Sequence, residues 1–172
     1  FAYQRTHGRQ STEEERKQIY AIKGRYFEEL GEPKRIPFAL ELAMKLKSQG
    51  YILFIVTGSG QPSLLDNIQH YFPGLFEKEN IISAFDVKRG KPFPDPYLKA
   101  LERAAVEPWE AVVIENAPLG VQASSAAHIF TSAVNTGPLD RNVLSENGAD
   151  IVFDSMKELF EQWDNLIVHL KV

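Results

Sequence analysis

The chain has 172 residues, of which 44% are hydrophobic, and its formal net charge at pH 7 is −4. This length suits one domain with a small appendage, and the apolar fraction is typical of a folded globular protein. No apolar run approaches the ~18 residues of a membrane span, and no basic block indicates nucleic-acid binding. Cysteine is absent, which excludes disulfides and thiolate sites and is compatible with a cytoplasmic location.

The first 31 residues are polar and charged, and they predict a separate helical piece. A capping pattern begins at Ser11, apolar residues follow at helical spacing, and Gly31 is expected to end this helix. After a connector, a second helix is expected from about Pro37 to Gly50.

From residue 51 onward, strand patterns and helix patterns alternate. Strands are expected at 51–56, 81–84, 111–114, 129–134 and 150–153, and helices at 62–71, 95–106, 118–127, 139–147 and 155–170. Helical crossovers return the chain to the same edge of a sheet, so the strands are expected to be parallel. The sequence therefore predicts an α/β fold, a Rossmann-like three-layer parallel sheet with helices on both faces.

The loop after the first strand is a candidate phosphate-binding loop. Thr57, Gly58 and Ser59 place a hydroxyl and small residues between a strand and a helix. Backbone N–H groups and a helix dipole can hold an anion there, and glycine allows its close approach. The alternative is a plain strand-to-helix turn, since neither a Walker A loop nor a dinucleotide-binding fingerprint occurs.

A second candidate is Lys91, in a loop that contains Pro92, Pro94 and Pro96. The prolines favour an extended loop that holds the lysine at the sheet edge. Its ammonium can pair with phosphate oxygens and with a carboxylate nucleophile. The alternative is a solvated basic loop.

A third candidate is the pair Glu115 and Asn116, directly after a buried strand and before a helix that begins near Pro118. Ligands bind past the carboxyl ends of strands in open α/β sheets, and carboxylate and amide oxygens suit Mg²⁺. The alternative is that Asn116 caps the following helix. The loop at 135–138 also follows a strand. Turn chemistry is its favoured interpretation, and lining the same cleft is the alternative.

Thr57, Lys91 and the pair Glu115 and Asn116 stand in the order of the second, third and fourth motifs of the haloacid dehalogenase superfamily. The chain resembles this family over essentially its whole length. Gly-Lys-Pro-Phe-Pro-Asp-Pro-Tyr and Ile-Glu-Asn-Ala-Pro-Leu-Gly-Val narrow the resemblance to the β-phosphoglucomutase-like branch. Val-Thr-Gly-Ser-Gly-Gln is similar to Bacteroides members of that branch, among them an inorganic pyrophosphatase.

The resemblance implies phosphoryl transfer through an aspartyl-phosphate, with Mg²⁺ as cofactor. Carried onto this chain, Thr57 and the N–H groups of Gly58 and Ser59 would bind the transferring phosphoryl group. Lys91 would balance charge between the nucleophile and the phosphate. Glu115 and Asn116 would hold or orient Mg²⁺. The family usually has Asp at position 116, and an amide there removes one negative charge from the metal site.

The Asp-x-Asp-Gly nucleophile motif of the family is absent from these 172 residues. By resemblance, residues 1–31 are expected to be the C-terminal part of a helical cap, and residues 32–172 a core without its first strand. The chain would then be a fragment or truncation, with a non-catalytic homologue as the alternative. If produced alone, it is expected to be unstable or to pair with another segment, because a central strand is missing.

These expectations favour a Mg²⁺-dependent phosphohydrolase that acts on a small phosphorylated metabolite or on pyrophosphate. A sugar-phosphate mutase and a catalytically dead binding module are the alternatives. No nucleic-acid or membrane partner is expected, and the oligomeric state is left open.

Overall fold

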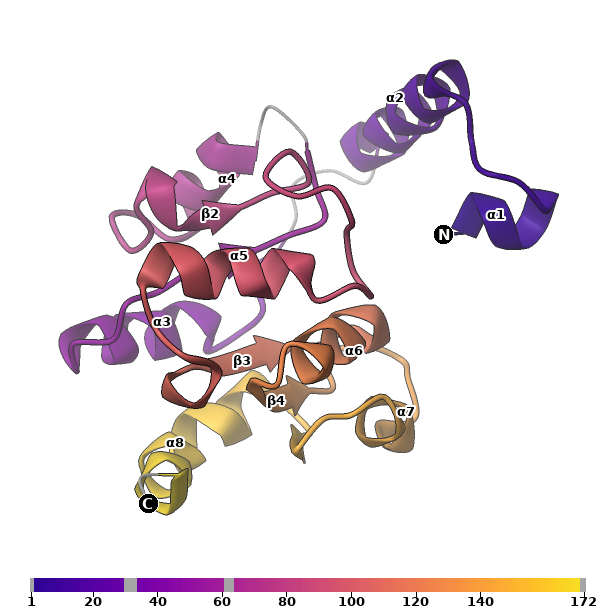
Figure 1. Cartoon of the computed structure of the whole chain (residues 1–172). Coiled ribbons are helices and arrows are strands. Elements are labelled where there is room, and N and C mark those ends of the chain that lie inside the picture. Colours follow the sequence, from indigo (N-terminus) through magenta and orange to yellow (C-terminus); the bar gives the residue numbers. More distant parts are fainter. Residues whose placement is uncertain (1, 30–33, 61–63, 171–172) are drawn as a thin grey trace. The chain divides into compact units, whose positions relative to one another are not determined.

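A computed structural model describes residues 2–29, 34–60 and 64–170 (Figure 1). The chain divides into two compact units, Phe1–Arg35 and Ile36–Val172. The assignment of residues 1–31 to a cap stays a prediction. The expected helix end at Gly31 lies outside the described residues, as do the first residues of the helix expected at 62–71.

The first unit contains α1 (Ala2–His7) and α2 (Glu13–Glu29). Helix α2 begins in a reciprocal capping box, in which the Thr12 N–H donates to Glu15 Oε2 at 2.8 Å and the Glu15 N–H donates to Thr12 Oγ1 at 3.2 Å. This start agrees with the capping pattern read from the sequence. Helix α1 was not expected, and the Tyr3 hydroxyl joins it to Glu15 at 2.6 Å.

The second unit alternates strands and helices as expected. Its strands are β1 (Ile55–Val56), β2 (Ile81–Ile82), β3 (Val112–Glu115), β4 (Phe130–Val134) and β5 (Ile151–Phe153). Its α-helices are α3 (Ala39–Ser48), α4 (Leu64–Tyr71), α5 (Asp95–Ala104), α6 (Pro118–Ala126), α7 (Arg141–Glu146) and α8 (Met156–Leu170). Short 3₁₀ turns precede β2 (Lys78–Asn80) and β3 (Pro108–Glu110).

The strands are parallel, but they form two sheets instead of one. Strand β1 pairs with β2, with Ile55 opposite Ile81. Strand β4 pairs with β3 on one side and with β5 on the other. Among the described residues, β1 and β3 share no ladder. The expected strands at 51–56 and 81–84 are accordingly shorter, because a segment counts as a strand only where a neighbour accepts and donates its hydrogen bonds.

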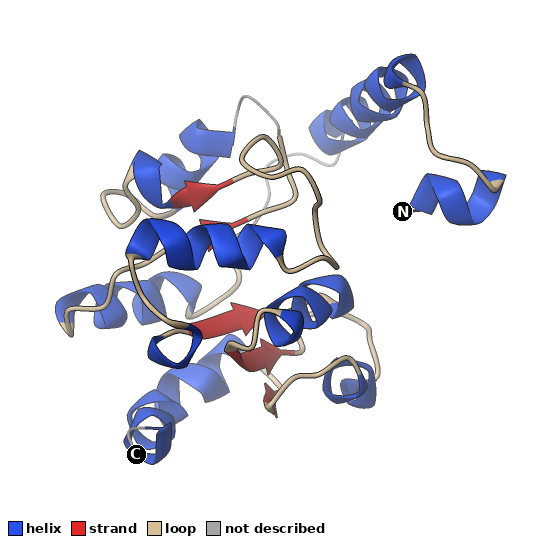
Figure 2. Ribbon diagram, viewed as in Figure 1, coloured by secondary structure: helices blue, strands red, loops and turns tan. Residues whose placement is uncertain are grey.

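Helices cover both faces of the larger sheet (Figure 2). One core cluster joins α3 and α8 to one face, through residues that include Leu46, Val134 and Leu159. Other clusters join α5, α6 and α7 to the opposite face, through residues that include Ala133 and Leu144. Neighbouring residues of β4 thus point to opposite faces, as the two-residue period of a strand requires. The three-layer prediction is confirmed.

Helix ends follow local chemistry. Helix α8 begins at a capped end, since the Glu158 N–H donates to Ser155 Oγ at 3.1 Å and the Asp154 N–H donates to Glu158 Oε2 at 2.7 Å. Within the described part of the chain, no helix is both long and apolar enough to cross a membrane.

Candidate active site

Lys91 connects the carboxyl ends of strands from the two sheets. Its ammonium donates to the carbonyl oxygen of Val56, the last residue of β1, at 3.0 Å. The same ammonium forms an ion pair with Glu115, the last residue of β3. Both side chains are largely buried, with 16% of Lys91 and 10% of Glu115 exposed. The alternative of a solvated basic loop is therefore wrong for Lys91.

The Glu115 carboxylate accepts hydrogen bonds on both oxygens. Oε1 receives the Lys91 ammonium and the hydroxyl of Tyr97, the latter at 2.8 Å. Oε2 receives the backbone N–H groups of Asn116 at 3.0 Å and Ala117 at 3.2 Å. Four donors thus hold this carboxylate in one orientation at the start of α6.

Charge and burial oppose each other at this pair. Burial disfavours the ionised form of Glu115, but the Lys91 charge and the accepted hydrogen bonds outweigh it, so the pKa of the carboxyl lies below its ordinary value. Burial, and then the charge of Glu115, raise the pKa of the Tyr97 phenol, which therefore remains a proton donor. Lys91 also lies 4.9 Å from the centre of the Tyr97 ring, within cation–π range.

The Asn116 side chain contacts the loop that follows the neighbouring strand β4 instead of capping α6. Its amide nitrogen donates to Thr136 Oγ1 at 2.8 Å. The residue before α6 is Ala117, which makes no side-chain cap, so the capping alternative for Asn116 is wrong. The contact places Thr136, from the loop at 135–138, beside Asn116. Lining the cleft was the less favoured interpretation of that loop.

The candidate phosphate loop lies directly after β1. The Thr57 N–H donates to the Ile82 carbonyl at 2.8 Å, and Thr57 Oγ1 accepts the Ser59 N–H at 3.1 Å. Ser59 therefore already uses the N–H that the resemblance assigned to phosphate. The Gly58 N–H has no acceptor among the described residues, so it is the better candidate donor of the two.

Few side chains at this site can act as metal ligands. Across the described ranges, no group of three His, Cys, Asp or Glu side chains gathers as a metal site. The amide oxygen of Asn116 is a hard oxygen donor whose chemistry fits Mg²⁺. Both oxygens of Glu115 already accept hydrogen bonds from four donors, so this carboxylate fits the role of orienting the ion and its waters better than that of a direct ligand. Since Mg²⁺ takes six ligands, water, substrate or other protein residues would have to supply most of them.

Two residues that touch this site were not singled out from the sequence. Tyr97 is 4% exposed and reaches Glu115 from α5. Gly120 lies in the first turn of α6, and its Cα faces the Glu115 carboxyl group. Both residues stand in the two phrases that carry the family resemblance. Their positions in those phrases do not reveal the contacts with Glu115, because both contacts are tertiary.

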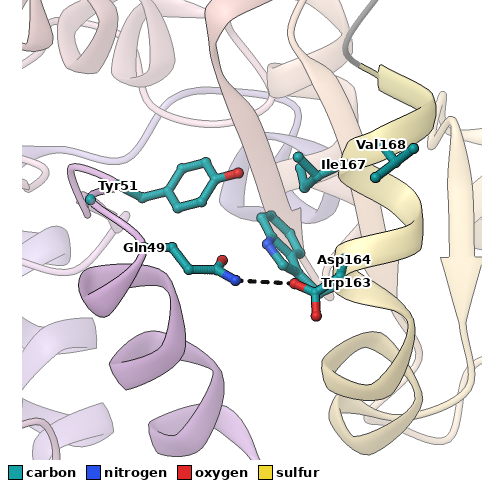
Figure 3. Close-up of a pocket in the computed structure, with 7 residues that line it drawn as sticks. Gln49, Tyr51, Trp163, Asp164, Ile167 and Val168 are labelled. Atoms are coloured by element: carbon teal, nitrogen blue, oxygen red, sulfur yellow. Dashed lines mark hydrogen bonds between the residues drawn. The ribbon is translucent and has the colours of Figure 1, made fainter.

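A pocket of roughly 550 Å³ lies elsewhere in the second unit (Figure 3). It lies between the turn that precedes β1 and helix α8, and its lining residues are Gln49, Gly50, Tyr51, Trp163, Asp164, Ile167 and Val168. None of the candidate site residues lines it. The pocket adjoins the start of the segment leading to β1, whereas the candidate site lies at the end of β1.

Comparison with known proteins agrees with the fold. The family model for haloacid dehalogenase-like hydrolases matches residues 2–134. The chain belongs to this family. Its resemblance to the β-phosphoglucomutase-like branch has support from a solved structure from Bacteroides vulgatus, provisionally named a beta-phosphoglucomutase. That structure is 50% identical with a TM-score of 0.89, over 99% of this chain and 69% of the other.

Two curated relatives are named as phosphatases. Hexitol phosphatase A of Escherichia coli is 36% identical over 72% of this chain and 55% of its own length. Validoxylamine A 7'-phosphate phosphatase of Streptomyces hygroscopicus is 33% identical over 74% of this chain and 57% of its own length. The chain thus spans little more than half the length of these relatives. The finer likeness to an inorganic pyrophosphatase stays a prediction.

Proposed function

We propose that the complete protein is a phosphohydrolase for small phosphorylated metabolites, of the sugar-phosphate or hexitol-phosphate class. The observation that carries this proposal is the bridge that Lys91 makes between the end of β1 and Glu115 at the end of β3. A buried cation at this edge of a parallel sheet suits a phosphoryl group that gathers negative charge during transfer.

The chain supplies distinct groups to such a reaction. The Thr57 hydroxyl and the Gly58 N–H bind phosphoryl oxygens, while Ser59 supports Thr57 through its hydrogen bond. The Lys91 ammonium offsets charge between the nucleophile and the phosphorus. Asn116 would hold Mg²⁺ and Glu115 would orient the ion and its waters, and the ion, when bound, would further neutralise the phosphoryl oxygens.

We place the nucleophile upstream of Phe1, in an Asp-x-Asp-Gly segment that attacks phosphorus to give an aspartyl-phosphate. Two features support this. The chain covers 69% of the Bacteroides vulgatus structure. In addition, β1 and β3 each have one ladder among the described residues, and a parallel strand between them would join the two sheets into one. We also propose that residues 1–31 are part of a helical cap domain and that the protein is cytoplasmic. Its substrate is proposed to be one of the small phosphorylated metabolites named above.

The test measures hydrolysis of p-nitrophenyl phosphate by the complete protein with Mg²⁺. We expect Lys91→Met and Thr57→Ala each to lower kcat by about 10²-fold, because each removes a group aimed at transition-state charge. Lys99→Met is the matched control, since Lys99 pairs with Glu102 on the surface of α5. Unchanged rates in both site variants would remove these residues from the site.

A mutase is the second candidate, favoured by the name and the 50% identity of the Bacteroides vulgatus protein. Supplying β-glucose 1-phosphate, hexitol phosphates and pyrophosphate to the complete protein separates the possibilities. Conversion to glucose 6-phosphate without phosphate release supports the mutase, and release from pyrophosphate supports the pyrophosphatase. Binding of a phosphorylated ligand without turnover of any of these compounds supports a binding module.

A further inference from the structure

Gly120 occupies a position where a side chain would collide with Glu115. A Cβ atom built on Gly120 would lie closer than 3.0 Å to three carboxyl atoms of Glu115, Cδ, Oε1 and Oε2. The carboxyl group therefore fills the space beside the Gly120 Cα. By contrast, a Cβ on Gly24 of helix α2 would meet nothing within 4 Å.

Backbone conformation does not explain this glycine. Gly120 is not among the residues with positive φ, so alanine could adopt its backbone angles. Glycine is also among the least favourable residues in a helix. Steric room for Glu115 is the remaining physical reason for glycine in the first turn of α6.

Tyr97 contacts the same carboxylate through a hydrogen bond. Its hydroxyl donates to Glu115 Oε1, the oxygen that also receives the Lys91 ammonium. Tyr97 is 4% exposed and belongs to a core cluster with Val113 of β3. A rigidly packed ring thus fixes the oxygen to which Lys91 binds.

We infer that Gly120 and Tyr97 are positioning residues that set the Glu115 carboxylate, and through it hold Lys91 at the end of β1. Gly120 admits the carboxylate to the start of α6, and Tyr97 directs Oε1 toward the ammonium. The catalytic consequence rests on the proposed function, whereas the steric and hydrogen-bonding relation rests on the geometry alone.

The first test measures the coupling between Lys91 and Glu115 without using activity. Urea unfolding of the complete protein, of Lys91→Met, of Glu115→Gln and of the double variant gives the interaction of the pair. The same four proteins are then measured with the Gly120→Ala substitution present in each of them. We expect the coupling to fall by at least about half, because the alanine methyl displaces the carboxylate. Equal coupling in the two backgrounds would overturn the inference.

The second test separates positioning from a general loss of folding. Gly120→Ala is expected to lower kcat by about 10²-fold with KM within about twofold, since it misplaces a charge without touching substrate. Adding Glu115→Asp shortens the acid and should recover part of the loss. Gly24→Ala is the matched helical control and should leave kcat unchanged. Failure of the shorter acid to recover any activity counts against a steric role.

Tyr97→Phe keeps the ring and removes only the hydroxyl, so it provides a variant that should fold. We expect kcat to fall by about tenfold, because Glu115 loses one of two donors on Oε1. Unchanged kcat would remove Tyr97 from the inference. If the unaltered protein hydrolyses none of the phosphate substrates, the proposed function fails, and the coupling measurement alone still decides the positioning role.

Discussion

Two adjacent hydroxyl residues in β4, Thr131 and Ser132, show how a buried polar side chain depends on its partner. Both are fully buried. Thr131 Oγ1 donates to Ser124 Oγ of helix α6 at 2.8 Å, whereas Ser132 Oγ has no partner among the described residues. Because a buried hydroxyl without a partner loses its water without compensation, the two positions should respond oppositely to substitution.

We expect Ser132→Ala to leave the free energy of unfolding unchanged or raise it by up to about 1 kcal/mol, because it removes an unpaired hydroxyl. Thr131→Val should lower it by about 1 to 2 kcal/mol, since its shape is kept while the bond to Ser124 is lost. Urea unfolding of the two variants measures both effects. Equal destabilisation by the two variants would contradict this account.

At the scale of elements, the side chain of Arg103 links α5 to β2 and to the turns that flank it through hydrogen bonds and an ion pair. Its guanidinium donates to the carbonyl oxygens of Glu79 and Ile81, each at 3.2 Å, and pairs with Asp86. Asp86 also accepts the N–H and the hydroxyl of Ser83, each at 2.8 Å. These contacts close the turn after β2 and orient the loop that leads to Lys91.

This arrangement makes a pH-dependent prediction. The Ser83 N–H, followed by the Ser83 hydroxyl and Arg103, holds the pKa of Asp86 below its ordinary value despite partial burial. A lowered folded pKa stabilises the protein fully above the unfolded value near about 4, and the contribution is lost as pH falls through the folded value. Asp86→Asn should therefore be less stable at pH 7, by roughly 1 kcal/mol.

Denaturant unfolding at several pH values between 7 and 2 checks this prediction. The difference in stability between the unaltered protein and Asp86→Asn should be constant down to about pH 5 and should shrink below about pH 4. A difference that grows on acidification would show that Asp86 is not stabilised as an anion.

For the second unit as a whole, the division into two sheets determines which hydrogen bonds are best protected. Strand β4 has ladders on both sides, whereas β1 and β2 pair only with each other in the described part of the chain. Side-chain packing links the two sheets, since Val56 of β1 contacts the cluster that includes Val113 of β3. A sheet of two short strands opens more easily than a three-stranded sheet with helices on both faces.

Under conditions in which circular dichroism shows that the 172-residue polypeptide is folded, hydrogen exchange should therefore show the β4 amides exchanging at least about tenfold more slowly than those of β1 and β2. In the complete protein, we expect protection of β1 and β3 to rise, because an upstream strand would pair with both. Mass spectrometry of peptides from the two forms measures this difference. Identical protection of β1 in both forms would contradict the proposed upstream strand.

Sequence alone determined the alternation of strands and helices, the parallel direction of the strands and the family. It also indicated that Thr57, Lys91 and Glu115 lie at the edge of the sheet where the parallel strands end. These features are local or follow from chain order: strand residues form apolar runs, caps precede helices, and parallel strands place their carboxyl ends together.

Only the tertiary structure decided how those residues meet. Lys91 bonds to Val56 and Glu115, which are 35 and 24 residues away in sequence, and Asn116 binds Thr136 instead of capping its own helix. The reason for a glycine at position 120 becomes visible only in the structure, where the Glu115 carboxylate fills the space beside its Cα. The sequence indicates which groups can donate, accept or leave room, whereas packing between distant elements decides which of them come into contact.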